Sequence, residues 1–127
     1  MNKVVHFEIP ADNLARADKF YSEVFGWQIK KAPMPGMEYH MATTVEVDEQ
    51  NMPKTPGAIN GGLMKRNALN EPVVIVIDVP NLDEHLTKIE AAGGKIVMPK
   101  MTVGDMGLYA RITDTEGNVI GLWQDLK

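Results

Sequence analysis

His6 and Glu8 stand two residues apart near the start of the chain and are the residues best placed to do chemistry. They lie in a partly alternating run over residues 4 to 9 that ends before Pro10, which predicts a strand. Side chains two apart on a strand point to one face, so the imidazole and the carboxylate would lie together. They could act as a general acid/base pair or as contacts to a bound molecule. A purely structural hydrogen-bonded pair is the alternative.

The other histidines have weaker claims to a functional role. His40 alternates with Tyr39 and Met41 in a strand predicted near residues 38 to 47, and the sequence leaves open which face of that strand lines a cleft. A partly exposed strand residue is the alternative interpretation of His40. His85 falls between apolar positions of a predicted helix and is expected near its surface.

The composition excludes several classes of function. The 127 residues contain no cysteine, which removes disulfides, thiolate metal sites and cysteine nucleophiles. The single serine, Ser22, lies inside a predicted helix, and no nucleotide-binding glycine motif occurs. A net charge of −4 without a basic run argues against nucleic acid as a partner. The apolar runs are too short for a membrane span, and the polar N-terminus is unlike a signal peptide, so a cytoplasmic protein is expected.

The elements that must position these residues begin with a strand and a helix. After the strand at residues 4 to 9, apolar residues recur at helical spacing from Leu14 to Phe25, with Asn13 as the predicted N-cap and Gly26 as the stop. Further strands are predicted over residues 27 to 31, 38 to 47 and 58 to 64. A turn at residues 33 to 36 and a polar loop at 48 to 56 would connect them.

The second half of the chain repeats this order. A β-branched strand over residues 73 to 79 precedes a helix capped by Asn81 and stopped by glycines at 93 and 94. Strands follow over residues 95 to 98, 108 to 113 and 119 to 124, with a turn at 116 to 118 between the last two. The repeat predicts an α+β fold of two β-α-β-β-β modules, about 1–66 and 70–127, within a single domain spanning residues 1–127.

Three segments carry a resemblance to the vicinal oxygen chelate superfamily, which includes glyoxalase I, extradiol dioxygenases and bleomycin-resistance proteins. They are Val5-His6-Phe7-Glu8-Ile9-Pro10, the helix motif from Asn13-Leu14 to Phe25-Gly26, and the stretch from Asp114 to Trp123. The resemblance covers essentially the whole chain. It implies two modules whose cupped mixed sheets enclose a cleft, and it implies a homodimer.

Metal-dependent relatives, as the resemblance implies, place four ligands in that cleft, one from the first and one from the last strand of each module. His6 matches the ligand of the first strand. The other three positions fall on Gly62, Val74 and Gly121, which offer no ligand atom from a side chain. A catalytic divalent ion needs about three protein ligands. The sequence therefore predicts a member without the metal centre of the superfamily and without a cofactor.

The favoured interpretation is a small-molecule binding protein with an apolar cleft for a hydrophobic or aromatic ligand. Glycines at two ligand positions would leave volume for a ligand, and large side chains would supply the walls. Arg111 could meet an anionic group, although a surface ion pair with Asp105 or Asp114 is favoured. The candidate ligand-binding residues are His6, Glu8, His40, Gly62, Met64, Val74, Tyr109, Gly121 and Trp123.

Two alternatives remain open from the sequence. One is a lyase- or isomerase-like enzyme that uses His6 and Glu8 for proton transfer on a carbonyl substrate. The other is a metal-dependent glyoxalase or dioxygenase with unconventional ligands, for example His6, Glu8 and His40 together. The sequence does not decide between an enzyme and a binding protein.

Overall fold

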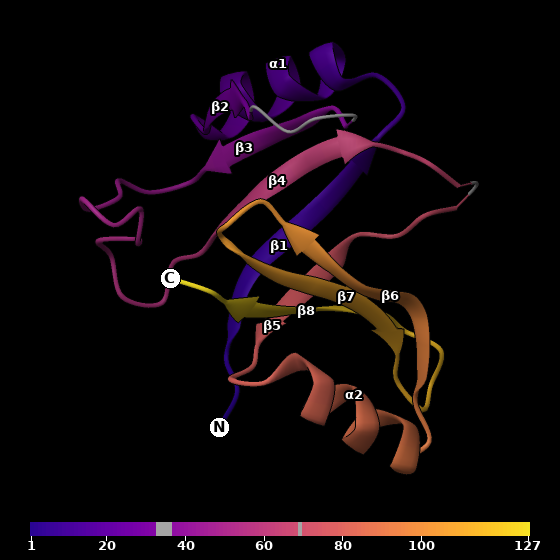
Figure 1. Cartoon of the computed structure of the whole chain (residues 1–127). Coiled ribbons are helices and arrows are strands. Elements are labelled where there is room, and N and C mark those ends of the chain that lie inside the picture. Colours follow the sequence, from indigo (N-terminus) through magenta and orange to yellow (C-terminus); the bar gives the residue numbers. More distant parts are fainter. Residues whose placement is uncertain (33–36, 69) are drawn as a thin grey trace. The chain divides into compact units, whose positions relative to one another are not determined.

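The order β-α-β-β-β occurs twice in the computed structural model, which describes residues 1–32, 37–68 and 70–127 (Figure 1). The turn predicted at residues 33 to 36 lies outside the described residues. The chain forms two compact units, residues 6–73 and residues 1–5 with 74–127. The elements are β1 (Val4–Ala11), α1 (Leu14–Phe25), β2 (Gln28–Lys31), β3 (Tyr39–Thr43), β4 (Asn60–Lys65), β5 (Val74–Asp78), α2 (Leu82–Ala91), β6 (Lys95–Val103), β7 (Gly107–Thr113) and β8 (Val119–Asp125).

Module one is a four-stranded mixed sheet with the order β2-β3-β4-β1, and α1 lies against one face of it (Figure 1). β1 runs parallel to β4, and the other pairs are antiparallel. The core between helix and sheet contains Ala11, Leu14 and Leu63, with Ile9 and Tyr21 packed against it. Asn13 caps the helix by accepting from the Arg16 N–H, and Gly26 ends it at φ 72°, as predicted.

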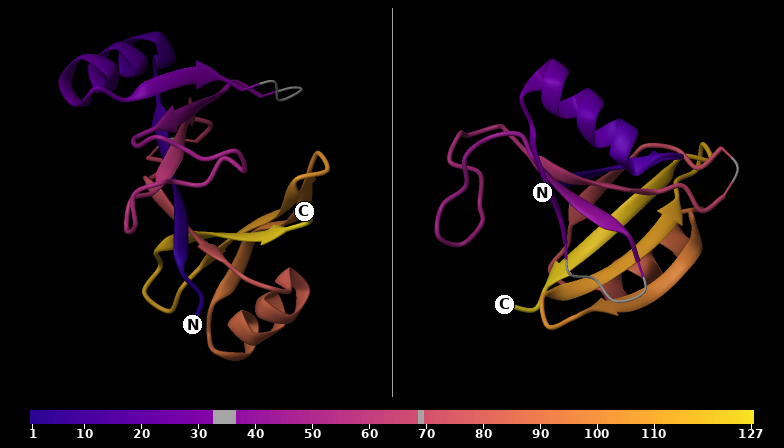
Figure 2. Two further views of the ribbon diagram at one scale, coloured as in Figure 1. Left: turned by 90° about the vertical axis from the view of Figure 1, so that its left-hand side faces the viewer. Right: turned by 90° about the horizontal axis from the view of Figure 1, so that it is seen from above.

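Module two repeats the arrangement with the order β5-β8-β7-β6 and with α2 on one face (Figure 2). β5 is parallel to β8, and β7 is antiparallel to both β8 and β6. Asn81 accepts a hydrogen bond from the Glu84 N–H at 3.1 Å, which confirms the predicted cap. The buried residues of the core are Val79, Leu82, Leu86, Ala110, Ile112 and Leu122.

Two prolines lie inside strands that were predicted to end before them. β1 continues to Ala11, whose carbonyl accepts a hydrogen bond from the Arg66 N–H. The backbone nitrogen of the neighbouring Pro10 therefore faces away from β4, and its missing N–H costs no hydrogen bond in the β1–β4 pair. β6 continues through Pro99 to Val103. β6 is the outermost strand of the order, and its register against β7 shifts between Met98 and Met101, which accommodates the proline.

The helices of the described segments are all too short and too polar to cross a bilayer.

Candidate functional site

The candidate residues of module one gather on the sheet face opposite α1, called here its far face. β1 and β4 are in register, with His6 beside Asn60 and Glu8 beside Gly62. Met64 lies opposite Tyr39 across the β3–β4 pair, which places this tyrosine on the same face. Ile9 points the other way into the core beneath α1, as alternation along a strand requires. The far face of module one thus carries His6, Glu8, Tyr39, Gly62 and Met64.

His6 and Tyr39 form the central polar contact of this face. The His6 Nε2 lies 2.7 Å from the Tyr39 hydroxyl oxygen, although the residues are far apart in sequence. Burial lowers the pKa of His6, and the nearby Glu8 carboxylate opposes this shift. The imidazole is therefore favoured in its neutral form, in which one nitrogen donates and the other accepts a hydrogen bond. Glu8 is itself buried.

The Tyr39 ring also covers Gly62. A Cβ built on Gly62 would collide with the hydroxyl and ring carbons of Tyr39. The expectation that this glycine leaves volume for a ligand is therefore wrong, because the tyrosine fills that space. Met64 is buried at 3% exposure beside the same ring.

Module two has the same arrangement on its own far face, the one opposite α2. The Tyr109 hydroxyl lies 2.9 Å from a Cβ built on Gly121, and the Val76 side chain approaches it at 3.0 Å. The space at the second glycine is therefore also filled. The Arg111 Nε donates to the Tyr109 hydroxyl at 2.7 Å. Val74 is fully buried.

Arg111 is buried and does not form the surface ion pair with Asp105 or Asp114 that the sequence favoured. Arg111 is 8% exposed and its Nε is bonded to Tyr109. Asp105 instead pairs with Lys127, with its Oδ2 3.4 Å from Nζ, and Asp114 accepts hydrogen bonds from its own turn. Buried guanidinium groups are found where they have partners, and here the tyrosine is one.

Trp123 lies opposite Tyr109 across the β7–β8 pair, so it shares the far face of module two. Its indole covers Gly107, where a built Cβ would collide with the six-membered ring. The indole N–H donates to the Asp125 Oδ1 at 2.8 Å. Both contacts lie on the nitrogen-bearing edge of the indole, and the ring lies next to Tyr109 on this face.

Tyr39 and Tyr109 occupy equivalent positions in the two modules. Tyr109 was predicted as a site residue, and Tyr39 was not. Each lies opposite the last residue of a repeated triplet, Gly62-Leu63-Met64 or Gly121-Leu122-Trp123. Each covers the glycine that begins its triplet. The triplet repeat was visible in the sequence. A tyrosine in the strand next to each triplet was the signal in the sequence that could have identified Tyr39 as the counterpart of Tyr109.

His40 lies on the opposite face from His6 and Glu8. It is adjacent to Tyr39 on β3, so its side chain points toward α1, where its Nδ1 is 2.7 Å from the Asp18 Oδ2. His40 therefore does not join His6 and Glu8 in one ligand set. Within residues 1–32, 37–68 and 70–127, no three His, Asp or Glu side chains are grouped as metal ligands.

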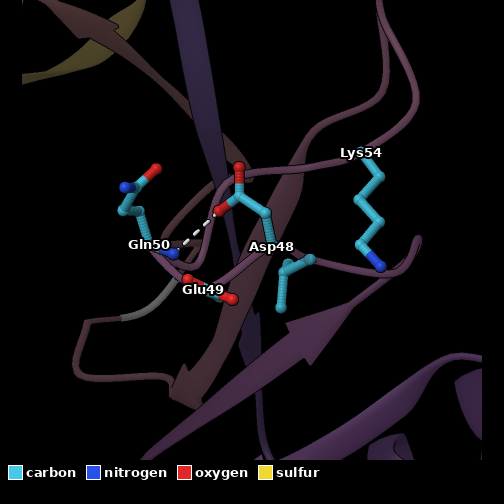
Figure 3. A pocket seen from close by; sticks show the side chains of 5 residues that line it. Asp48, Glu49, Gln50 and Lys54 are labelled. Atoms are coloured by element: carbon cyan, nitrogen blue, oxygen red, sulfur yellow. Dashed lines mark hydrogen bonds between the residues drawn. The ribbon is translucent and has the colours of Figure 1, made fainter.

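The loop between β3 and β4 lines two shallow hollows of about 500 and 480 Å³, and β2 and the end of β3 also line the second. Figure 3 shows the first, in which the Asp48 Oδ1 accepts from the Gln50 N–H at 2.8 Å. Lys54 lines both hollows. Neither is lined by a residue predicted from the sequence, and their walls are mainly charged and amide side chains. Apolar ligands are not favoured by such walls.

Comparison with known proteins gives a family and a fold. The family model described as Glyoxalase/Bleomycin resistance protein/Dioxygenase superfamily matches residues 3–122. The proteins named "Putative glyoxylase CFP32" from Mycobacterium bovis and Mycobacterium tuberculosis are 33% identical over 120 residues, which cover 92% of this chain. Those residues span only 43% of each mycobacterial protein, so the chain corresponds to less than half of their length.

Solved structures share the fold at low sequence identity. Streptomyces coelicolor methylmalonyl-CoA epimerase, in complex with 2-nitronate-propionyl-CoA, gives a TM-score of 0.69 at 13% identity and covers 100% of this chain and 99% of that one. A glyoxalase/bleomycin resistance protein/dioxygenase superfamily member from Vibrio splendidus 12B01 gives 0.64 at 15% identity, covering 98% and 100%. These likenesses concern the fold alone.

Proposed function

This chain belongs to the glyoxalase/bleomycin resistance protein/dioxygenase superfamily, and on that basis we propose that it binds an apolar or aromatic small molecule without a metal ion. The ligand would contact the far face of module two, where Trp123 lies opposite Tyr109. The observation that carries the metal-free part of the proposal is the tyrosine ring that fills the space above Gly62 in module one and above Gly121 in module two, where the resemblance would place metal-ligating side chains.

The residues at the four ligand positions do not fit a divalent ion. Gly62 and Gly121 have no donor atom in a side chain, and the Val74 side chain is apolar. His6 is the remaining position, and its Nε2 is engaged with the Tyr39 hydroxyl. One imidazole falls short of the roughly three protein ligands of a catalytic site. No step of the proposed function therefore passes through a metal.

The far face of module two favours an uncharged aromatic ligand. Tyr109 and Trp123 provide ring surface there, and aromatic rings stack on such surfaces with favourable offset geometry.

Metal analysis and ligand binding test the proposal together. Tag-free protein should contain well under one metal ion per chain by elemental analysis, and its melting temperature should not change with a chelator. A panel of neutral aromatic compounds should quench tryptophan fluorescence in wild type and in Trp27→Phe, but not in Trp123→Phe. Trp27 is the matched control because it stacks on Tyr21 of α1, at 4.9 Å between ring centroids. One tightly held ion per chain, or no binding across the panel, would overturn the proposal.

An acid–base enzyme is the second candidate, favoured by the His6–Tyr39 contact beside Glu8. A neutral imidazole can take up a proton, and the neighbouring carboxylate stabilises the resulting cation. The protein would then exchange the proton next to a carbonyl group with solvent. Deuterium uptake by small ketones and aldehydes in D2O measures this, and His6→Ala should abolish it. For a binding protein, His6→Ala changes affinity only.

A homodimer is also proposed. β2 and β6 are the outermost strands of the sheet order. Exposed sheet edges and incompletely covered faces are commonly covered by a second copy. Sedimentation equilibrium should give twice the chain mass of 14.1 kDa, and a monomer at micromolar concentration would contradict it.

A further inference from the structure

Three large apolar side chains of α1 lie open to solvent. Phe20, Val24 and Phe25, called here the apolar patch, are 52%, 58% and 59% exposed. Single exposed apolar residues are common, but a contiguous group of them marks an interaction surface. We propose that two copies of the chain pair through this patch, with α1 of one copy packed antiparallel against α1 of the other. The inference rests on the proposed homodimer and names its interface.

The exposed rings of the patch are held by partly buried rings behind them. Phe20 and Phe25 lie edge to face, with centroids 6.2 Å apart. Both contact Tyr21, at 5.1 and 6.1 Å between centroids. Tyr21 in turn stacks on Trp27 at 4.9 Å and 9° between ring planes. The patch is therefore a preformed surface, which loses little side-chain entropy when a partner covers it.

The equivalent helix of module two shows that the fold does not need an exposed ring on α1. Counted from the equivalent N-caps Asn13 and Asn81, Phe20 corresponds to Lys88 of α2. Lys88 is exposed, as is usual for a charged residue on the solvent side of a helix. Packing of a helix onto its own sheet therefore leaves the phenyl ring at position 20 unexplained, and a partner surface explains it.

The size and surroundings of the patch suit the centre of a dimer interface. A buried aromatic side chain covers about 150–250 Å², so three half-exposed apolar side chains offer roughly 300 Å². A standard interface takes about 800 Å² from each partner, with an apolar centre inside a polar rim. Arg16, Lys19 and Glu23 are exposed on the same helix and would supply the rim.

The charges along α1 fit an antiparallel copy of the same helix. Arg16 and Glu23 are about two helical turns apart, so they lie on one side of α1 with Phe20 between them. A two-fold axis brings one surface against itself. With that axis beside Phe20, Arg16 of each copy lies opposite Glu23 of the other, and two ion pairs flank the paired rings.

These charges also specify the orientation of the two helices. A parallel pairing would place Arg16 against Arg16 and Glu23 against Glu23, which is unfavourable. In the part of the chain that the structure describes, neither Arg16 nor Glu23 takes part in an ion pair within its own copy. Both side chains therefore remain for a partner.

Phe20→Lys tests the inference, because it gives α1 the residue type that α2 carries at the equivalent position. Lys88→Glu on α2 is the matched control. By sedimentation equilibrium, Phe20→Lys should raise the dimer dissociation constant by roughly a hundredfold or more, since each dimer loses two central rings and brings two ammonium groups together. Lys88→Glu should leave the dissociation constant unchanged. Both positions are exposed, so circular dichroism should show both variants folded.

Charge reversal tests the antiparallel arrangement. Arg16→Glu or Glu23→Arg alone places like charges opposite each other and should weaken the dimer about tenfold. The two reversals in one chain restore opposite charges and should bring the dissociation constant back to within roughly twofold of the wild-type value. A less stable helix would not account for this pattern, because acidic residues near the N-terminus and basic residues near the C-terminus of a helix are favourable.

The outcomes separate this inference from the proposed homodimer. A wild-type chain that is monomeric at micromolar concentration would overturn both. A wild-type dimer that persists unchanged in Phe20→Lys, or that Lys88→Glu weakens equally, would overturn the inference and assign pairing to another surface, such as the outermost strands. A double reversal variant as weak as the single variants would overturn the antiparallel pairing of the helices.

Discussion

Tyr39 lies on β3 directly above Gly62 of β4, so that its hydroxyl and ring occupy the space a side chain at position 62 would need. The two residues are diagonal neighbours in the sheet, because Tyr39 is opposite Met64 and Gly62 is two positions earlier. Large side chains reach a diagonal neighbour on the same face. Glycine at 62 is thus required by the packing of the tyrosine, with no need for an unusual backbone angle.

Gly62→Ala should destabilise the protein by about 1–3 kcal/mol, the usual cost of forcing an extra methyl group into a packed site. The added Cβ meets both the hydroxyl and ring carbons of Tyr39, so the ring must move away from His6. Urea denaturation measures the stability loss, and the His6 imidazole resonances should shift in the same variant.

Tyr39→Ala supplies the control background for this substitution. With the ring absent, the alanine at 62 has room, so Gly62→Ala should cost less than half as much as in the wild type. The coupling energy of the double-mutant cycle then isolates the Tyr39–Gly62 contact. An equal cost in both backgrounds would show that something other than Tyr39 excludes a side chain at 62.

The pH dependence of stability should carry a contribution from His6. Burial lowers the pKa of His6 from its ordinary value of 6.5, so the unfolded chain binds this proton more readily than the folded chain. Stability should therefore fall as the pH falls from 6.5 through the folded pKa, and level off below it. Urea midpoints between pH 4 and pH 8 measure the effect, and His6→Gln should remove this part of the pH dependence.

Glu8→Gln tests the cause of the shift. The carboxylate raises the pKa of His6 against the larger effect of burial. Its removal should lower the pKa of His6 further, as followed by NMR titration. A rise in that pKa on removal of the charge would contradict the electrostatic assignment.

The architecture was predictable from the sequence because its signals are local. Asn13 and Asn81 begin α1 and α2 by accepting a backbone N–H with their own side chains, and Gly26 ends α1 in the left-handed conformation. The strand ends at Pro10 and Pro99 were misjudged. Whether a proline breaks a strand depends on which neighbour its missing N–H would face, and that is decided by pairing partners distant in sequence.

The candidate site was predictable only in part. Alternation along β1 placed His6 and Glu8 on one face because that rule needs no partner strand. It could not orient β3, so His40 was a candidate for the far face and Tyr39 was overlooked. The space above Gly62 was misjudged for the same reason. The space that a glycine leaves in one strand is occupied by a side chain of the neighbouring strand. Which side chain occupies it depends on the register between β3 and β4.

The turn after β7 should lose stability in acid through Asp114. The Asn118 backbone N–H and side-chain amide donate to Asp114 at 2.9 and 3.0 Å, and the Glu116 N–H donates at 2.8 Å. These bonds, those of Asn118 first, hold the pKa of Asp114 below its ordinary value of 3.8. A lowered carboxyl pKa stabilises the folded state above 3.8, and that stabilisation is lost as the pH falls through the folded pKa. Urea midpoints from pH 2.5 to 7 should therefore decline less steeply at the acid end in Asp114→Asn.

Asp105→Asn is the matched control for Asp114→Asn. Asp105 is an exposed carboxylate whose contact is an ion pair with Lys127. Exposed ion pairs of this kind contribute little to stability. The acid limb of the curve should therefore stay as in the wild type, and a flattening equal to that of Asp114→Asn would contradict the assignment to the turn.

α1 should depend on the contact between Asp18 and His40 for its attachment to the sheet. The Asp18 Oδ2 lies 2.7 Å from the His40 Nδ1, and these side chains are 28% and 13% exposed. Within its described length the helix contributes one buried residue, Leu14. Asp18→Ala should cost about 1–2 kcal/mol, as expected for a partly buried hydrogen bond to a charged group. The double-mutant cycle with His40→Ala should give a coupling energy near 1 kcal/mol.

Glu23→Ala, an exposed substitution on the same helix, should show no coupling to His40→Ala. Additive effects of Asp18→Ala and His40→Ala would mean that apolar packing alone holds the helix.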